Sequence, residues 1–234
     1  MVETLIQNLL VKRGIQDEKD IETFLNPNYE EGLHDPFLMN GMEKAVARFL
    51  SALSKNERIV IFTDYDTDGL PAAVMFHDFF KKIGYENFEN YIPHRHAEGF
   101  GLSTKAIEKC KEGGAKFLIT VDCGITNHDE IAHANALGID VIITDHHEPP
   151  TTLPEAYAIL NPHQNEDKYP FKELCGCGVA FKFVQGIIEE GRRQGVFDIH
   201  DGWEKWLLDM VAIATISDMV PLRGENRTLA YYGL

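Results

Sequence analysis

The sequence predicts an α/β fold: an open, mostly parallel sheet with helices on both faces, preceded by a small helical segment. From about residue 42 onward, short apolar and β-branched runs alternate with amphipathic stretches of helical length, which is the pattern of βαβ units. The apolar runs are nearly continuous, as expected of strands covered on both faces. We therefore divide the chain into a helical segment, residues 1–41, and an α/β domain, residues 42–234.

The individual elements follow from periodicity and from their end signals. Helical spacing in the first forty residues, punctuated by Pro27 and Pro36, predicts short helices there. Pro71 in the first turn and Gly84 at the end bound one later helix, and Ser103 is the expected N-cap of the next. The expected strands are 58–64, 88–93, 116–122, 140–145 and 157–162, and the expected helices are 42–56, 71–84, 103–114, 126–138, 177–193 and 203–216.

Composition limits the class of protein. The chain has 234 residues, of which 44% are hydrophobic, so it can bury a core and is not disordered. No apolar run approaches the roughly 20 residues that span a bilayer, and the N-terminus with its early Glu3 lacks a secretory signal pattern. The four cysteines are too dispersed for a disulfide scaffold. We therefore expect a cytoplasmic protein with no membrane partner.

The net charge of −15 argues against a broad electrostatic grip on nucleic acid. It fits a carboxylate-rich site that needs cations. Acidic side chains also dominate ordinary solvated surfaces, so the charge alone does not decide the function.

Three predicted strands each deliver an aspartate at the carboxyl end: Asp64, Asp122 and Asp145. In a parallel sheet these ends meet at one edge, where ligands bind. Carboxylates held close together repel one another unless cations neutralise them. With His146 and His147 directly after the third of these strands, a site for two divalent ions is expected. Mixed carboxylate and imidazole ligands suit Mn²⁺ best, with Mg²⁺ or Co²⁺ possible.

Four acidic motifs occur in order: DYDTDG at 64–69, VDCG at 121–124, DHH at 145–147 and DMVPL at 218–222. A GCGVAF loop at 176–181 stands between the third and the fourth, and stretches such as IPHRHAEGFGLS at 92–103 agree. Together they resemble the DHH phosphoesterases and, within them, the RecJ-type single-strand-specific exonucleases. The resemblance runs from about residue 8 to the last residue.

This resemblance implies two divalent ions and their ligands. Asp122 is expected to bridge the ions, and His146 is expected to bind the same ion as Asp68, whose shell Asp218 completes. Asp64 lies next to these ligands, and strand-end hydrogen bonding is an equal alternative for it. The candidate metal ligands are Asp64, Asp66, Asp68, Asp122, His146 and Asp218.

The candidate catalytic residues are His147 and Asp145. The resemblance implies that His147 faces the scissile phosphate and stabilises its charge, while Asp145 orients neighbouring groups or simply makes strand-end hydrogen bonds. Two ions can share and activate a hydroxide that attacks the phosphorus in line. No side-chain nucleophile is therefore needed.

Four further residues are candidate substrate contacts. Arg95 could reach a phosphate, or form a salt bridge to Glu98. Gly176 and Gly178 resemble an anion-receiving helix N-terminus, or a tight turn that happens to precede a helix. Asn161 ends a strand at the active edge, although an Asn before Pro also starts turns.

The chain also departs from the family pattern. RecJ-type enzymes continue into a second, substrate-binding domain that forms the other wall of the groove, and this domain is absent here. We expect either a fragment of a longer protein or a partner chain that completes the groove. The resemblance implies single-stranded nucleic acid as the substrate, DNA rather than RNA, and digestion from 5′ to 3′.

Two other functions stay open. One is a phosphodiesterase acting on short oligonucleotides or dinucleotides, although Phe62 stands where that branch of the superfamily carries a histidine. The other is a non-catalytic scaffold in a replication or repair complex. The full set of acids weighs against the scaffold.

Overall fold

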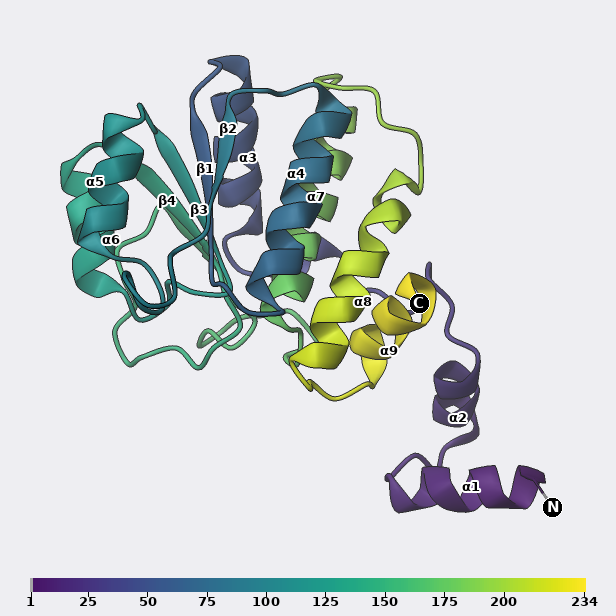
Figure 1. Cartoon of the computed structure of the whole chain (residues 1–234). Coiled ribbons are helices and arrows are strands. Elements are labelled where there is room, and N and C mark those ends of the chain that lie inside the picture. Colours follow the sequence, from purple (N-terminus) through teal and green to yellow (C-terminus); the bar gives the residue numbers. More distant parts are fainter. Residues whose placement is uncertain (1) are drawn as a thin grey trace.

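The computed structural model describes residues 2–234, with side chains from residue 4 onward, and is built on a five-stranded sheet (Figure 1). Its strand order is β2-β1-β3-β4-β5, and every pairing is parallel. The direction of winding changes between β1 and β3, which opens a crevice outside their carboxyl ends. The strands are β1 (Ile59–Thr63), β2 (Phe88–Tyr91), β3 (Phe117–Val121), β4 (Asp140–Thr144) and β5 (Ala158–Leu160).

Helices cover both faces of the sheet, which confirms the predicted fold class (Figure 1). One face carries α5 (Thr104–Glu112) and α6 (His128–Ala136). The other carries α3 (Met42–Ser54), α4 (Gly69–Ile83) and α7 (Gly176–Arg193), and α8 (Leu208–Ser217) packs against α4 and α7. In the part of the chain that the structure describes, no helix has the length and apolarity to cross a bilayer.

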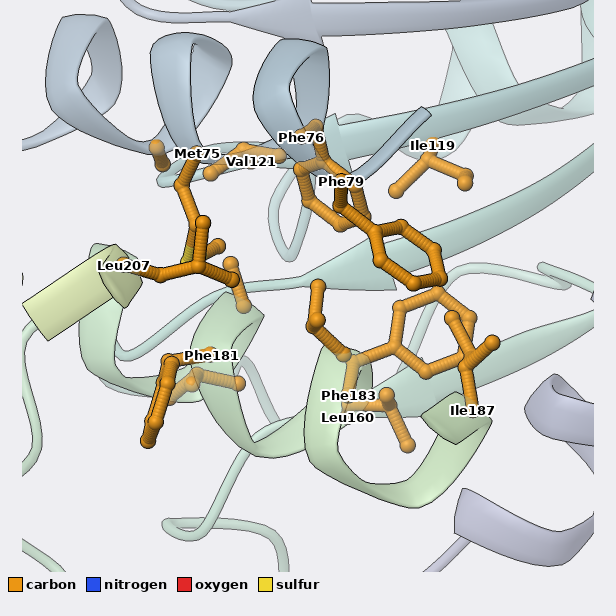
Figure 2. Close-up of a cluster of buried hydrophobic side chains, with 14 of the residues drawn as sticks. Met75, Phe76, Phe79, Ile119, Val121, Leu160, Phe181, Phe183, Ile187 and Leu207 are labelled. Atoms are coloured by element: carbon orange, nitrogen blue, oxygen red, sulfur yellow. The ribbon is translucent and has the colours of Figure 1, made fainter. Parts of the chain in front are cut away.

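The alternation of side chains along each strand divides the core into two clusters. In β1, Ile59 and Ile61 belong to the larger cluster, and Val60 and Phe62 belong to the smaller one on the α5–α6 side. Figure 2 shows the larger cluster, where side chains from α4 and α7 meet those of β3 and β5. Because all five residues of β1 are buried, both faces hold the strand firmly and fix the position of its carboxyl end.

The N-terminal segment is helical, with α1 (Val2–Lys12), α2 (Glu18–Leu25) and the 3₁₀ turn η1 (Pro36–Leu38). In Figure 1, α1 and α2 extend away from the α/β body, beside α9 (Gly224–Gly233). Arg227 Nε donates to the carbonyl of Phe24 at 3.1 Å, and the Tyr232 hydroxyl donates to Pro27 at 3.1 Å. These contacts attach the segment to the last helix.

In the C-terminal part, one expectation was wrong and one helix was missed. Residues 203–216 form a 3₁₀ turn, η2 (Trp203–Leu207), followed by α8, and not one continuous helix. Helix α9 was not predicted at all. Its buried face includes Glu225, Asn226 and Thr228, so no apolar stripe marks it in the sequence. Glu225 accepts from the N–H of His34 and from the Tyr169 hydroxyl, and Asn226 Nδ2 donates to the carbonyl of Pro221.

Candidate metal centre at the carboxyl edge of the sheet

The strand-end aspartates stay in register with the sheet, which fixes their backbone. Asp122 N–H donates to Thr144 at 2.9 Å and Asp145 N–H donates to Leu160 at 3.0 Å. Asp122 itself has a φ of +59°, a left-handed conformation that Asp and Asn tolerate better than most residues. The chain therefore turns sharply at the end of β3 and points the Asp122 carboxylate along the carboxyl edge.

His146 lies among carboxylates from three different elements. Its Nε2 is 3.3 Å from Asp122 Oδ1 and 3.8 Å from Asp68 Oδ2, and its Nδ1 is 3.9 Å from Asp218 Oδ2 at the end of α8. Asp68 and Asp122 are only 2% and 3% exposed. Buried carboxylates at this spacing repel one another, so the cluster requires a positive partner.

The donor set fits a divalent cation. Among the described residues, two groups converge with ligand atoms within 4.8 Å of one another: Asp68–His146–Asp218 and Asp122–His146–His147. Asp122 Oδ1 is buried and receives no hydrogen bond from the described residues. A buried oxygen without a donor is costly, and a cation would supply the missing partner. Carboxylate and imidazole ligands together suit Mn²⁺ and related ions.

The pKa values of the cluster show the same need for positive charge. Burial raises the pKa of Asp122 to about 8, and the neighbouring Asp68 carboxylate adds to the shift. Burial also raises the pKa of Asp68 and of Asp218. Burial would lower the pKa of His146, but the carboxylates of Asp122, Asp68 and Asp218 outweigh it and raise that pKa to about 9. Without a metal, the cluster therefore holds protons that a divalent cation would displace.

The N-terminus of α7 is occupied by a carboxylate. Gly176 N–H donates to Asp68 Oδ2 at 2.6 Å and Cys177 N–H donates to Oδ1 at 2.8 Å. Gly178 N–H donates to the Cys175 thiol at 3.3 Å. The expectation that Gly176 and Gly178 receive a substrate anion is therefore corrected, because Asp68 accepts the N–H of Gly176 and the Cys175 thiol accepts that of Gly178.

Asp145 orients the two histidines. It is 1% exposed, and its Oδ1 accepts the N–H of His146 at 2.8 Å and that of His147 at 3.1 Å. His147 Nδ1 lies 2.7 Å from the same oxygen, and Ile125 N–H donates to Oδ2 at 3.0 Å. Although burial opposes it, these bonds lower the pKa of Asp145. In return, Asp145 raises the pKa of the exposed His147, which favours a protonated ring facing the crevice.

Asp64 and Asp66 border the convergent groups. Asp64 Oδ1 accepts the N–H of Tyr65 at 2.6 Å, and burial raises its pKa. Asp66 is exposed, and its Oδ1 accepts the N–H groups of Asp68 and Gly69 at 2.9 Å each, at the start of α4. The charge of Asp66 contributes to the raised pKa of Asp122. Both acids thus add negative potential to the centre while part of their hydrogen-bonding capacity is used locally.

Arg95 lies on an aromatic ring at the margin of the centre. Its guanidinium is 4.6 Å from the centroid of Tyr65, whose ring is 4.8 Å from that of Phe100. The alternative partner, Glu98, pairs instead with Lys109 at 2.9 Å. The sequence analysis missed Tyr65 and Phe100, although Tyr65 lies in the DYDTDG motif and Phe100 lies in the IPHRHAEGFGLS stretch.

Asn161 supports the histidine loop. It is fully buried, its Nδ2 donates to the carbonyl of His147 at 2.9 Å and its Oδ1 accepts the N–H of His163 at 2.8 Å. The expectation that Asn161 contacts substrate is corrected, because burial and these two bonds leave the side chain no reach into the crevice.

An open parallel sheet with a carboxylate and imidazole cluster at its switch point defines an α/β protein with a metal centre. A family model described as "DHH family, N-terminal domain" matches residues 58–215, which include the strand-end acids and His146. The chain belongs to the DHH family.

The chain is also similar to several exonucleases. The single-stranded-DNA-specific exonuclease RecJ of Bacillus subtilis is 42% identical over 234 residues, and the chain spans 28% of its length. A crystal structure of exonuclease RecJ bound to manganese superposes with a TM-score of 0.72 and 33% identity over 83% of this chain and 47% of that one. RecJ of Thermus thermophilus in complex with Mn²⁺ gives 0.74 and 29% identity over 96% of this chain and 30% of that one.

Proposed function

We propose that this chain is the metal-dependent catalytic domain of an exonuclease that hydrolyses phosphodiester bonds in single-stranded DNA from the 5′ end. The observation that carries the proposal is the convergence of Asp68, Asp122, Asp218 and His146 around one space. The activity of the similar single-stranded-DNA-specific exonucleases supports it, although the chain spans only 28% of the length of Bacillus subtilis RecJ.

The proposed centre holds two divalent ions, with Mn²⁺ preferred. Five carboxylates, of Asp64, Asp66, Asp68, Asp122 and Asp218, lie in or beside the cluster around His146, which supports two ions. Manganese in two similar structures supports the choice of Mn²⁺. In this proposal Asp122 lies between the ions, and Asp64 and Asp66 complete the ligand set. When bound, the ions would lower the pKa of a water and offset charge on the phosphate.

The residues of the chain then have distinct tasks. Asp145 holds His147 through Nδ1, which fixes the ring and leaves its other nitrogen for the phosphate. Because Asp145 raises the pKa of His147, the ring can donate a hydrogen bond to a phosphoryl oxygen as negative charge develops there. Asn161 donates a hydrogen bond to the carbonyl of His147 and so helps to fix the backbone of the loop that carries this histidine.

The margin of the centre suits the end of a strand. A depression of about 380 Å³ is lined by Tyr65, Asp66 and Arg95 together with apolar residues of α4. Bases stack on exposed aromatic rings whatever their sequence, and arginines bind phosphates. Since the chain carries a net charge of −15, a further domain or partner chain is proposed to supply the rest of the phosphate grip.

The test is hydrolysis of a labelled single-stranded DNA by this chain with Mn²⁺, compared with duplex DNA, single-stranded RNA and a dinucleotide. We expect Mn²⁺-dependent release of nucleotides from the 5′ end of single-stranded DNA, with a high apparent KM. The Asp122→Asn variant should be inactive. Preference for the dinucleotide would favour a short-oligonucleotide phosphodiesterase, and no hydrolysis of any substrate would favour a scaffold.

A further inference from the structure

The first turn of α7 lies between the two most buried carboxylates of the centre. On one side, the N–H groups of Gly176 and Cys177 donate to the two oxygens of Asp68 at 2.6 and 2.8 Å. On the other side, the Cα of Gly176 faces Asp122. Asp68 and Asp122 come from segments that are far from this turn in the sequence, so the turn is the element that both of them touch.

A side chain at Gly176 would collide with Asp122. An added Cβ would lie 2.6 Å from Asp122 Oδ1, 2.7 Å from its Cβ and 2.9 Å from its Cα. The contact includes backbone, and the Asp122 N–H is bonded to Thr144 in the sheet. Asp122 is also 3% exposed. It therefore cannot retreat without moving the end of β3.

Gly178, one residue beyond Cys177, has no such restriction. A Cβ there would lie 3.4 Å from atoms of Leu174 and 3.7 Å from the Cys175 thiol, which are ordinary van der Waals contacts. Both glycines belong to the same helix, and neither has a positive φ. The two positions thus differ mainly in their contact with the centre.

Electrostatics explains why such a turn would be placed beside Asp68. The free N–H groups and the positive end of the helix dipole favour a carboxylate at an N-terminus, and two charge-assisted hydrogen bonds fix its rotation. Asp68 is thereby held in one orientation although burial raises its pKa. Asp122 Oδ1, by contrast, receives no hydrogen bond among the described residues, and its nearest positive group is His146 Nε2 at 3.3 Å.

We propose that the Gly176–Cys177 turn is a positioning element that sets the separation of Asp68 and Asp122, and thereby the affinity of the centre for its metal. The N–H groups hold Asp68, and the missing Cβ of Gly176 lets Asp122 approach. This inference rests on the proposed metal centre and adds two residues that bind neither metal nor substrate.

The first experiment compares Gly176→Ala with the matched control Gly178→Ala by calorimetric titration of Mn²⁺ into EDTA-stripped protein. Outer-shell changes typically weaken metal binding about 10- to 100-fold, and we expect a loss of that size for Gly176→Ala. Gly178→Ala should bind Mn²⁺ like the parent chain. Equal affinities of the two variants would overturn the inference, whereas no Mn²⁺ binding by the parent chain would overturn the proposed function itself.

The second experiment tests the hydrogen bonds and does not depend on the steric contact. Cys177→Pro removes the N–H that reaches Asp68, and Gly178→Pro removes an N–H that reaches only the Cys175 thiol. Both lie in the first turn, where proline is best tolerated in a helix. We expect a weaker Mn²⁺ affinity and an altered Mn²⁺ electron paramagnetic resonance spectrum for Cys177→Pro alone.

Unfolding of the metal-free variants separates positioning from folding. We expect Gly176→Ala and Gly178→Ala to melt at similar temperatures in EDTA, with a difference between them only when Mn²⁺ is added. Failure of both Gly176→Ala and Cys177→Pro to fold while their controls fold would overturn the inference, because the turn would then belong to the core and not to the centre.

Discussion

Helix α7 contacts two buried charged clusters of opposite character. At its first turn, the carboxylates of Asp68 and Asp122 both lie beside His146, and Asp122 Oδ1 receives no hydrogen bond among the described residues. Two turns later, Lys182 Nζ lies 3.3 Å from Glu225 Oε1, and both side chains are fully buried. One cluster gathers like charges, and the other pairs opposite charges.

The second cluster is also well satisfied by hydrogen bonds. Lys182 donates to the carbonyl of His34 at 2.6 Å. Glu225 accepts the N–H of His34 at 2.8 Å and the hydroxyl of Tyr169 at 2.6 Å. It therefore joins the N-terminal segment, α7 and α9. The difference teaches that a buried pair with satisfied hydrogen bonds is costly to break by removing one partner, whereas an unsatisfied group of acids persists only where a ligand completes it.

The largest expected effect is on the satisfied cluster. Glu225→Gln leaves Lys182 charged and buried without its partner, so the free energy of unfolding should fall by about 3–5 kcal/mol. Denaturant unfolding in EDTA measures it, with the exposed Glu112→Gln as the control. Mn²⁺ affinity of the folded variant should stay unchanged. If Glu225→Gln lost no more unfolding free energy than the control, the Lys182–Glu225 pair would not hold these three segments together.

The second effect concerns the division of work between the histidines. His147→Ala should lower kcat by about 10²–10³ and leave Mn²⁺ affinity intact, because Asp145 and not a ligand set holds the ring. His146→Ala should lose Mn²⁺, since three carboxylates converge on it. Calorimetry and single-turnover hydrolysis separate the two. Equal loss of Mn²⁺ in both variants would make His147 a ligand.

The sequence predicts the frame of the centre better than its details. Strand-end periodicity places Asp122 and Asp145 at one edge, and the structure brings Asp68, Asp122, His146 and Asp218 together there. Whether they bind metal stays a prediction. Local patterns report only on near neighbours in the chain, so they assigned the N–H groups of Gly176 to a phosphate, while tertiary packing assigns them to Asp68.

The same limit explains the other errors. Asn161 reads as a strand-end polar group facing the crevice, but the loop of His147 folds over it. Helix α9 could not be predicted from an apolar pattern because its buried face includes polar residues such as Glu225, whose partners lie far away in the sequence. Hydrophobic periodicity in a sequence identifies the apolar faces of helices and strands, but it does not identify a buried ion pair such as Lys182–Glu225.

The third effect is a gain in the free energy of unfolding, whereas Glu225→Gln should cause a loss. Asp122→Asn removes a carboxylate from an unsatisfied cluster, so the metal-free variant should be about 1–2 kcal/mol more stable than the parent chain near pH 8, although it no longer binds Mn²⁺. Asn is the suitable replacement because it tolerates the φ of +59° at this position. A destabilised variant would show that the protein itself satisfies the carboxylates of the metal-free cluster.

The pH dependence of this third effect follows from the pKa of Asp122. Burial raises it from 3.8 to about 8, so the folded state binds more protons than the unfolded state in that interval. The contribution of Asp122 to stability is therefore fully present below pH 3.8 and is lost as pH rises through about 8. The advantage of Asp122→Asn should grow across this window in denaturant titrations, and saturating Mn²⁺ should reverse it.

The smallest effect concerns a third pair, at the surface, whose lysine is exposed. Glu98 bonds to Lys109 at 2.9 Å and to the N–H of His94 at 2.8 Å, and it orders the loop that carries Arg95. Water compensates such charges, so Glu98→Gln should change the free energy of unfolding by less than about 1 kcal/mol. Because a looser loop holds Arg95 less well, KM for single-stranded DNA should rise about two- to fivefold at constant kcat. If Glu98→Gln lowered the free energy of unfolding as much as Glu225→Gln does, the exposure of an ion pair would not predict its contribution to stability in this protein.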